Sequence, residues 1–289
     1  MLPTRMRRSI LAAVFTFAFT ATASAFTGPE AQSAFVERRG FLEVDTRCHL
    51  LAAGPRNALE AGAQQARGAL LRSGWTRARV DELEQATLRA ARSRACNDPR
   101  NETAATQARA GFATWSRTNV MTFPGAERSW TARRYADPMG WRLRQDISAP
   151  SAVFGVRERE GVQRLTLMLP LAATEAAPSA VQILVRDRAR AGVDVLELRG
   201  RTARGLAVGA PAANNAQGFF ASARSVETIE RQRYAVIEFP DTAFEALLAL
   251  DPREAAQLRI ERGRAVENIL VEVGDIAVAR TFLTLRPEV

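Results

Sequence analysis

The stretch "RLTLMLPL", residues 164–171, decides the fold class because its leucines alternate along the chain. Leu165, Leu167 and Leu169 would share one face of a β-strand, since successive side chains of a strand point to opposite sides. Three further stretches also read as strands: "AVQILVRDR" (180–188), "RYAVIEF" (233–239) and "NILVEVGD" (268–275). Repeated strands separated by turns predict an antiparallel β-sandwich or a strongly curved antiparallel sheet over residues 128–289.

Turns and short helices connect these strands. A hairpin is expected to turn near Glu160-Gly161. The segment 205–218, rich in glycine, alanine, proline and asparagine, predicts a long loop. Two short helices are expected, each after an aspartate that can cap it: 244–250 after Asp241, and 276–283 after Asp275.

The chain before residue 119 has the periodicity of helices instead. Apolar side chains recur three, four or seven residues apart, which places them on one face of a helix. The first such face comprises Ala34, Phe41, Val44, Cys48 and Leu51. Many inward positions of the later helices are alanine, as at Ala63, Ala66, Ala105 and Ala108. These helices can pack closely, but the core that they bury is thin.

Start and stop signals divide this half into helices. They are a capping box at Asn57 and Glu60, a stop at Gly74, a cap at Thr76, and a fourth start at Asp98-Pro99. We therefore predict an α+β protein, with a small N-terminal helical bundle followed by an antiparallel β-sandwich-like domain. Its segments would be a signal peptide (1–25), a disulfide-stapled helical module (26–118), a hinge (119–127) and the β domain with two short helices (128–289).

The first residues have the pattern of a secretory signal peptide. Arg5, Arg7 and Arg8 precede the apolar run 10–19, and Ala23-Ser24-Ala25 ends it with small residues. Cleavage after Ala25 would release a periplasmic or secreted protein without a transmembrane segment. The arginine pair also resembles a twin-arginine signal, so both export routes stay open.

Cys48 and Cys96 are the only cysteines, and His49 is the only histidine. Neighbouring side chains of a helix point about 100° apart, so Cys48 and His49 do not form a catalytic pair. A structural zinc site needs four ligands, and these three residues fall short. In an oxidising compartment two cysteines of one small unit pair with each other. We therefore predict a Cys48–Cys96 disulfide and no metal site.

The charge of the chain sets limits on its partners. The formal net charge is +9, and all basic residues are arginine, since lysine is absent. The arginines are spread along the chain among acidic residues, which argues against a nucleic-acid-binding face. Without lysine, no Schiff-base chemistry is open to the protein, and no phosphate-cradling or dinucleotide motif is present. We therefore predict no nucleic-acid partner and no cofactor.

One basic and aromatic stretch is a candidate binding site. Residues 128–145, "RSWTARRYADPMGWRLRQ", carry six side chains that could stack on or pair with an anionic glycan or lipid: Trp130, Arg133, Arg134, Tyr135, Trp141 and Arg142. The alternative is two strands around a turn at Asp137-Pro138, with the tryptophans in the core and the arginines in solvent. We favour this second interpretation.

Two pairs of carboxylates offer the enzymatic alternative. Glu158 with Glu160, and Asp194 with Glu197, could supply acid and base to a hydrolase acting on cell-wall glycan. That chemistry needs two carboxylates opposed across a cleft, whereas these are sequence neighbours with arginines nearby. Surface charge explains them more simply.

The mature chain resembles a group of uncharacterised secreted proteins of GC-rich bacteria. The resemblance rests on the two-cysteine helical half and on the ending "FPD…ALLALDPREA…VEVGD…AR.FL", residues 239–283. This ending also resembles invasion-associated locus B proteins, which implies a β-sandwich with short helices and no particular activity. The sequence as a whole predicts a non-enzymatic protein that binds an envelope component or a partner protein.

Overall fold

The computed structural model describes residues 28–148, 152–192, 201–202, 205–206 and 211–285. The predicted signal peptide, with its cleavage point at Ala25, lies outside these ranges, and so do Asp194 and Glu197.

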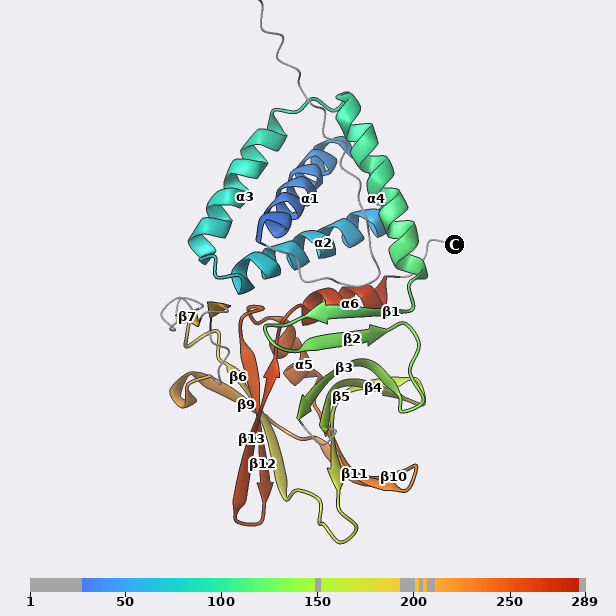
Figure 1. Cartoon of the computed structure of the whole chain (residues 1–289), viewed down its shortest axis with the longest axis vertical. Helices are drawn as coiled ribbons and strands as arrows, with labels where there is room; N and C mark the ends of the chain where they lie inside the picture. Colours follow the sequence, from blue (N-terminus) through green and yellow to red (C-terminus); the bar gives the residue numbers. More distant parts are fainter. Residues whose placement is uncertain (1–27, 149–151, 193–200, 203–204, 207–210, 286–289) are drawn as a thin grey trace, which may run out of the picture.

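Four helices form the N-terminal half, as the periodicity predicts. They are α1 (Gly28–Cys48), α2 (Ala53–Arg72), α3 (Arg77–Arg92) and α4 (Pro99–Arg117). In Figure 1, α2, α3 and α4 outline a triangular frame around α1. The inward side chains that hold this frame are Phe35, Phe41, Leu59, Leu70 and many alanines, so the core is thin, as expected.

Most predicted helix ends are confirmed. The Thr76 hydroxyl accepts a hydrogen bond from the Arg79 N–H, and the Asp98 carboxylate accepts one from the Arg100 N–H, ahead of Pro99. The predicted capping box at Asn57 is wrong, because α2 already begins at Ala53. Helix α2 has no side-chain cap. In the loop before it, the Leu50 and Leu51 N–H groups donate hydrogen bonds to the Asp45 carboxylate of α1.

The C-terminal half is built of two antiparallel sheets, which confirms the α+β, sandwich-like prediction. The larger sheet has the order β1-β2-β3-β4-β5-β11-β10: β1 (Val120–Pro124), β2 (Ser129–Arg133), β3 (Trp141–Ser148), β4 (Ala152–Arg159), β5 (Val162–Leu171), β11 (Gln232–Phe239) and β10 (Ala223–Ile229). The smaller sheet has the order β13-β12-β6-β9: β13 (Ala265–Glu272), β12 (Ala255–Arg262), β6 (Ala180–Arg186) and β9 (Ala216–Phe220). A two-stranded ribbon pairs β7 (Arg201–Thr202) with β8 (Gly205–Leu206).

The alternating leucines of residues 164–171 lie where the sequence places them. Leu165, Leu167 and Leu169 are buried in the main core, together with the alternating residues of β6 and β13. The hairpin from β4 to β5 turns at Glu160 and Gly161, which both have a positive φ. Helices α5 (Asp241–Leu248) and α6 (Ile276–Thr284) flank the sheets.

Residues 119–127, interpreted above as a hinge, contain a strand of the larger sheet instead. Strand β1 pairs with β2, and the loop between them is held by Glu272 of β13. The Glu272 carboxylate is buried and accepts hydrogen bonds from the backbone N–H groups of Ala126, Glu127 and Arg128, at 2.6–3.1 Å. Gly125 is required here because any side chain would collide with that carboxylate.

The predicted loop 205–218 is also partly structured. Strand β8 begins it, a short 3-10 helix, η2 (Ala213–Asn215), follows, and β9 pairs with β6 from Ala216 onward. Glycine and alanine hide this strand in the sequence because they carry little β-propensity.

The two aspartates expected to cap α5 and α6 do not act as caps. Asp241 is the first residue of α5, and Asp275 makes no capping hydrogen bond. The Asp275 carboxylate is instead paired with Arg72 of α2 through two hydrogen bonds, at 2.6 and 2.8 Å. This buried pair joins the helical half to the β half where α2 lies beside α6 (Figure 1).

One hydrophobic cluster extends across the two halves, and the helical half has two smaller clusters of its own. Phe112 and Trp115 of α4 belong to the same cluster as the inner faces of both sheets. The Trp115 ring meets Phe282 of α6 edge-on, with ring centroids 5.5 Å apart. The helical half therefore packs directly on the β half.

Candidate ligand-binding site

A cavity of about 420 Å³ opens between α1, α2 and α4 in the helical half. Its wall is mainly apolar and includes Phe41, Leu59, Phe112 and Trp115. This volume lies within the range of small-molecule binding sites, and such an apolar wall with a few polar groups is typical of them.

Small residues of α1 and α4 line this cavity. Gly40 lies on α1, and Ala104, Ala108 and Gly111 follow one face of α4 at intervals of four and three residues. Helix α1 packs closely on α2 and α3, whereas α4 rests mainly on α2. No large side chain fills the remaining space between α1 and α4.

Charged side chains also line the cavity. They are Arg38, Arg94 and Arg100, with one carboxylate, Glu37. The Arg38 guanidinium donates a hydrogen bond of 2.7 Å to the Gly62 carbonyl of α2, which fixes its position. Burial raises the pKa of Glu37, although the Arg38 charge opposes that rise. Burial also lowers the pKa of Arg38.

Arg100 is partly neutralised by a carboxylate outside the cavity. Its guanidinium donates hydrogen bonds to Asp98, which lower the pKa of Asp98 to about 2 and keep it ionised. Arg38 and Arg94, against the single carboxylate of Glu37, therefore leave the charged groups of the cavity wall with a positive excess.

The predicted disulfide is present in the helical half, at the end of α1. Cys48 and Cys96 are bonded, with their Cα atoms 5.5 Å apart. The bond links the end of α1 to the loop between α3 and α4, next to Arg94 and Arg100. His49 is exposed at the end of α1, as expected of a residue without a catalytic partner.

The six residues of the basic and aromatic stretch do not form one surface. Trp130 and Trp141 are both buried, with 0% and 1% exposure, which agrees with the favoured core interpretation. They lie on opposite faces of the larger sheet, however. A β-bulge shifts the pairing of β3 with β4 between Trp141 and Leu143, so Trp141 packs on the outer face.

Arg134 joins parts of the fold together. Its guanidinium donates hydrogen bonds to the carbonyls of Trp115 and Thr118 at the end of α4, and of Leu285 at the end of α6. It also lies 4.2 Å from the centroid of the Phe282 ring. A cation is stabilised at the C-terminal ends of helices, where unpaired carbonyls concentrate negative charge.

The other three residues of the stretch also point in different directions. Arg142 pairs with Glu158 at 2.5 Å and donates to the Arg133 carbonyl. The Arg133 side chain lies 3.9 Å from Asp137. Tyr135 is 75% exposed. Nothing brings Tyr135 together with the buried tryptophan rings to form a stacking platform.

The described carboxylate pair does not have the arrangement of a glycosidase. Hydrogen bonds from Gln163 and the Arg142 charge lower the pKa of Glu158, although a general acid needs a raised pKa. Glu160 lies in the turn between β4 and β5. These two residues therefore do not face each other across a cleft.

The sequence did not identify the cavity. The signal in the sequence is the spacing of small residues on α4, which by itself indicates only a thin core. In the described part of the chain, no group of three or more His, Cys, Asp or Glu side chains could hold a metal ion. Nor does any helix within the described ranges have the length and apolar character needed to cross a membrane.

Comparison with known proteins gives no match to a family model, a curated protein sequence or a solved structure. The resemblances given by the sequence therefore stay predictions, and the function must be argued from the cavity itself.

Proposed function

We propose that the protein binds an envelope component that has an apolar acyl chain and an acidic head group, and that the chain enters the cavity between α1, α2 and α4. The observation that carries this proposal is the pairing of an apolar cavity of about 420 Å³ with arginines in its wall. A molecule with an apolar tail and an anionic head is complementary to both features.

The apolar wall supplies the driving force. Burying one methylene group stabilises a complex by about 0.8 kcal/mol, or about fourfold in affinity. Phe112 and Trp115 line the cavity and belong to the main core, so this part of the wall is formed without a ligand. A preformed wall keeps the cost of ordering the site low.

The arginines supply orientation. Arg38 is held by the Gly62 carbonyl, and Arg94 is half-buried at the edge of the cavity. An acidic head group would lie between them, with the chain directed toward Trp115. The disulfide, which is typical of proteins outside the cytosol, supports an envelope location.

The proposal is tested by titrating the protein with octanoate, decanoate and dodecanoate and following the heat of binding, or the total tryptophan fluorescence, to which Trp115 contributes. We expect the affinity to rise about fourfold for each added methylene until the cavity is full. The alcohols of the same chain lengths should bind more weakly because they leave the arginines without an anion. Affinity that does not depend on chain length would contradict the proposal.

Matched variants locate the site. Ala108→Leu should fill the cavity and abolish binding, whereas Ala110→Leu, at an exposed position of the same helix, should bind as the wild type does. Arg94→Gln should weaken the carboxylates but not the alcohols. Its control is Arg92→Gln, since Arg92 pairs with Glu43 on the outside of the bundle. If a cavity variant and its control changed the binding affinity equally, the ligand would bind elsewhere on the protein.

A further inference from the structure

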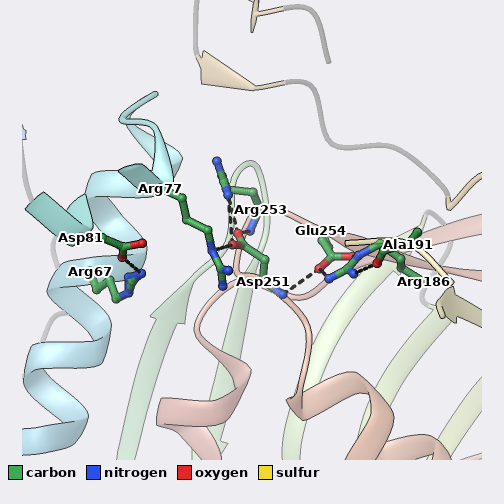
Figure 2. Close-up of polar contacts among 8 residues, drawn as sticks. All are labelled: Arg67, Arg77, Asp81, Arg186, Ala191, Asp251, Arg253 and Glu254. Atoms are coloured by element: carbon green, nitrogen blue, oxygen red, sulfur yellow. Dashed lines mark hydrogen bonds and ion pairs between the residues drawn. The ribbon is translucent and has the colours of Figure 1, made fainter. Parts of the chain in front are cut away.

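Ion pairs occupy the end of the β half that faces the helices. Figure 2 shows Arg77, at the start of α3, beside Asp251 of the segment after α5, with their N and O atoms 3.7 Å apart. Arg253 donates to the same carboxylate at 2.8 and 3.0 Å. Next to it, Arg186 binds both oxygens of Glu254, at 2.7 and 2.8 Å. The hairpins β10–β11 and β12–β13 lie at the opposite end of the β half, away from the helices (Figure 1).

Strand β10 is an edge of the larger sheet and is exposed along most of its length. It stands last in the strand order and, among the described strands, pairs with β11 alone. Val226 of β10 lies opposite Ala235, which is buried in the main core, yet the Val226 side chain is 46% exposed. The core-facing side of the sheet therefore ends at β10 with an apolar side chain in solvent. An exposed edge of this kind offers its backbone N–H and C=O groups to a further strand.

The turn after β10 identifies which of its backbone groups are free. The two turn residues, Glu230 and Arg231, both have a positive φ, as a type I′ hairpin turn requires. The residues on either side of this turn are Cα partners, and they form the hydrogen-bonded pair that closes it. Because hydrogen-bonded and non-hydrogen-bonded pairs alternate along an antiparallel ladder, every second residue of β10 directs its N–H and C=O away from β11. These residues are Arg224, Val226 and Thr228.

The other edges of the two sheets are covered, charged or short. Helix α6 lies beside β1 (Figure 1). Two backbone groups near the end of β13 are bound by the side chains of Arg128 and Gln145. The rest of β13 carries Glu267, an exposed acid without an ion-pair partner among the described residues, and such a charge opposes pairing with another chain. Strand β9 has only five residues and includes Gly218, which weakens a strand.

The charges of β10 are arranged differently. Glu227, in the middle of the strand, is already neutralised by Arg157 at 2.9 Å and Arg159 at 2.6 Å, both from β4. The strand has a basic residue, Arg224, near its start and an exposed acidic residue, Glu230, directly after its end. A second β10 strand in the antiparallel direction would bring these opposite charges together, so the edge is complementary to itself.

We propose that β10 is a dimerisation edge, at which a second copy of the chain adds its own β10 in the antiparallel direction. In the symmetric register, Val226 faces Val226 of the second copy, and all seven residues of the strand are paired. The outward N–H and C=O groups then meet the same groups of the other copy. Arg224 faces Thr228 of the second copy and is the diagonal neighbour of its Glu230, within reach of a long side chain. This dimer is independent of the apolar cavity in the helical half.

The test is sedimentation equilibrium of the protein from micromolar to millimolar concentration, where we expect a monomer–dimer equilibrium. Val226→Lys places two like charges opposite each other at the twofold axis, and it should weaken dimerisation by about tenfold or more. Its matched control is Val266→Lys, because Val266 of β13 is exposed to a similar extent, 49%. That variant should dimerise as the wild type does.

A second pair of variants tests the charges. Glu230→Arg replaces the proposed contact with Arg224 by a like-charge contact and should also weaken the dimer. Glu267→Arg makes the same change of charge on β13 and should leave the dimer unchanged.

Amide hydrogen exchange locates the pairing at single residues. The amides expected to become protected as the protein concentration rises are those of Arg224, Val226 and Thr228. The amides of Ser225 and Glu227 already bond to β11 and should not change. A wild-type protein that stays monomeric at millimolar concentration would overturn the proposal. So would a dimer that Val226→Lys and Val266→Lys weaken equally, or one that leaves the three outward amides of β10 unprotected.

Discussion

Two buried tryptophans, Trp130 and Trp141, differ in what their indole N–H groups meet. The Trp130 N–H donates to the carbonyls of Glu272 and Val273, at 2.9 and 3.0 Å. The Trp141 N–H is buried and has no partner among the described residues. The two rings are therefore equally buried, but only one carries part of the hydrogen-bonding network beneath the sheet.

Replacement by phenylalanine should separate these two roles. Trp130→Phe removes one donor from two buried carbonyls, which keep hydrogen bonds from Gln145 Nε2 (3.1 Å) and the Ile276 N–H (3.2 Å). We therefore expect it to lose about 1 kcal/mol more stability than Trp141→Phe. Trp141→Phe removes a donor that is already unpaired and costs mainly packing volume. Urea unfolding of both variants measures the difference. Equal losses would mean that the Trp141 N–H has a partner after all, such as a bound water.

The sequence could predict that these tryptophans are buried but not where each ring points. Alternation along a strand assigns a face only while the register is regular. The bulge between Trp141 and Leu143 moves Trp141 to the outer face, and nothing in residues 128–145 reveals it. For the same reason the sequence could not show that Arg134 turns back to the ends of α4 and α6.

Helices α1 to α4 were predictable because their ends are marked locally. Thr76 and Asp98 cap the helices that follow them, and Gly74 ends α2 with a positive φ. Asp275 has the same local signal, but its carboxylate binds Arg72, which is 203 positions away in the sequence. An ion pair with a residue far away in the sequence can thus use a carboxylate that the local sequence predicts to be a helix cap.

The candidate cavity could not be predicted for a related reason. Each small residue of α4 is compatible with close helix packing, and only the position of α4 relative to α1 leaves the space open. The disulfide was easier to predict than the cavity because the chain contains only two cysteines.

Removing the disulfide should destabilise the helical half strongly. The bond closes a span of 48 residues, and the chain-entropy model gives a stabilisation of about 4 kcal/mol for a loop of that length. We expect the double variant Cys48→Ser/Cys96→Ser to lose about that amount in urea unfolding. Reduced wild-type protein should lose the same. A loss below about 1 kcal/mol would show that the unfolded chain is already restricted in this region.

The buried pair of Arg72 and Asp275 is one of the polar links between the two halves of the molecule. Arg72→Met would leave a buried carboxylate without its partner, which costs about 3–5 kcal/mol. Adding Asp275→Asn removes the unpaired charge and should restore more than half of that loss. The control is Arg92→Met, since the exposed pair of Arg92 with Glu43 contributes at most about 1 kcal/mol.

The pH dependence of Arg72→Met gives an independent check. Burial raises the pKa of Asp275, and the Arg72 charge opposes that rise. Without Arg72 the pKa rises further, so the folded state holds a proton that the unfolded state releases. Stability then falls as the pH rises, and the loss caused by Arg72→Met should shrink between pH 7 and pH 4. A loss that is constant with pH would show that Asp275 has gained another partner.

The position of residues 272–285 determines when the chain can finish folding. Glu272 completes the loop after β1, Asp275 pairs with Arg72, and the Leu285 carbonyl receives Arg134. The partners of these three groups, which are the loop after β1, Arg72 and Arg134, precede them in the chain by more than a hundred residues. These contacts can therefore form only after residues 272–285 have been synthesised. A chain that ends before residue 272 therefore lacks the partners of the loop after β1, of Arg72 and of Arg134, and it cannot complete these contacts.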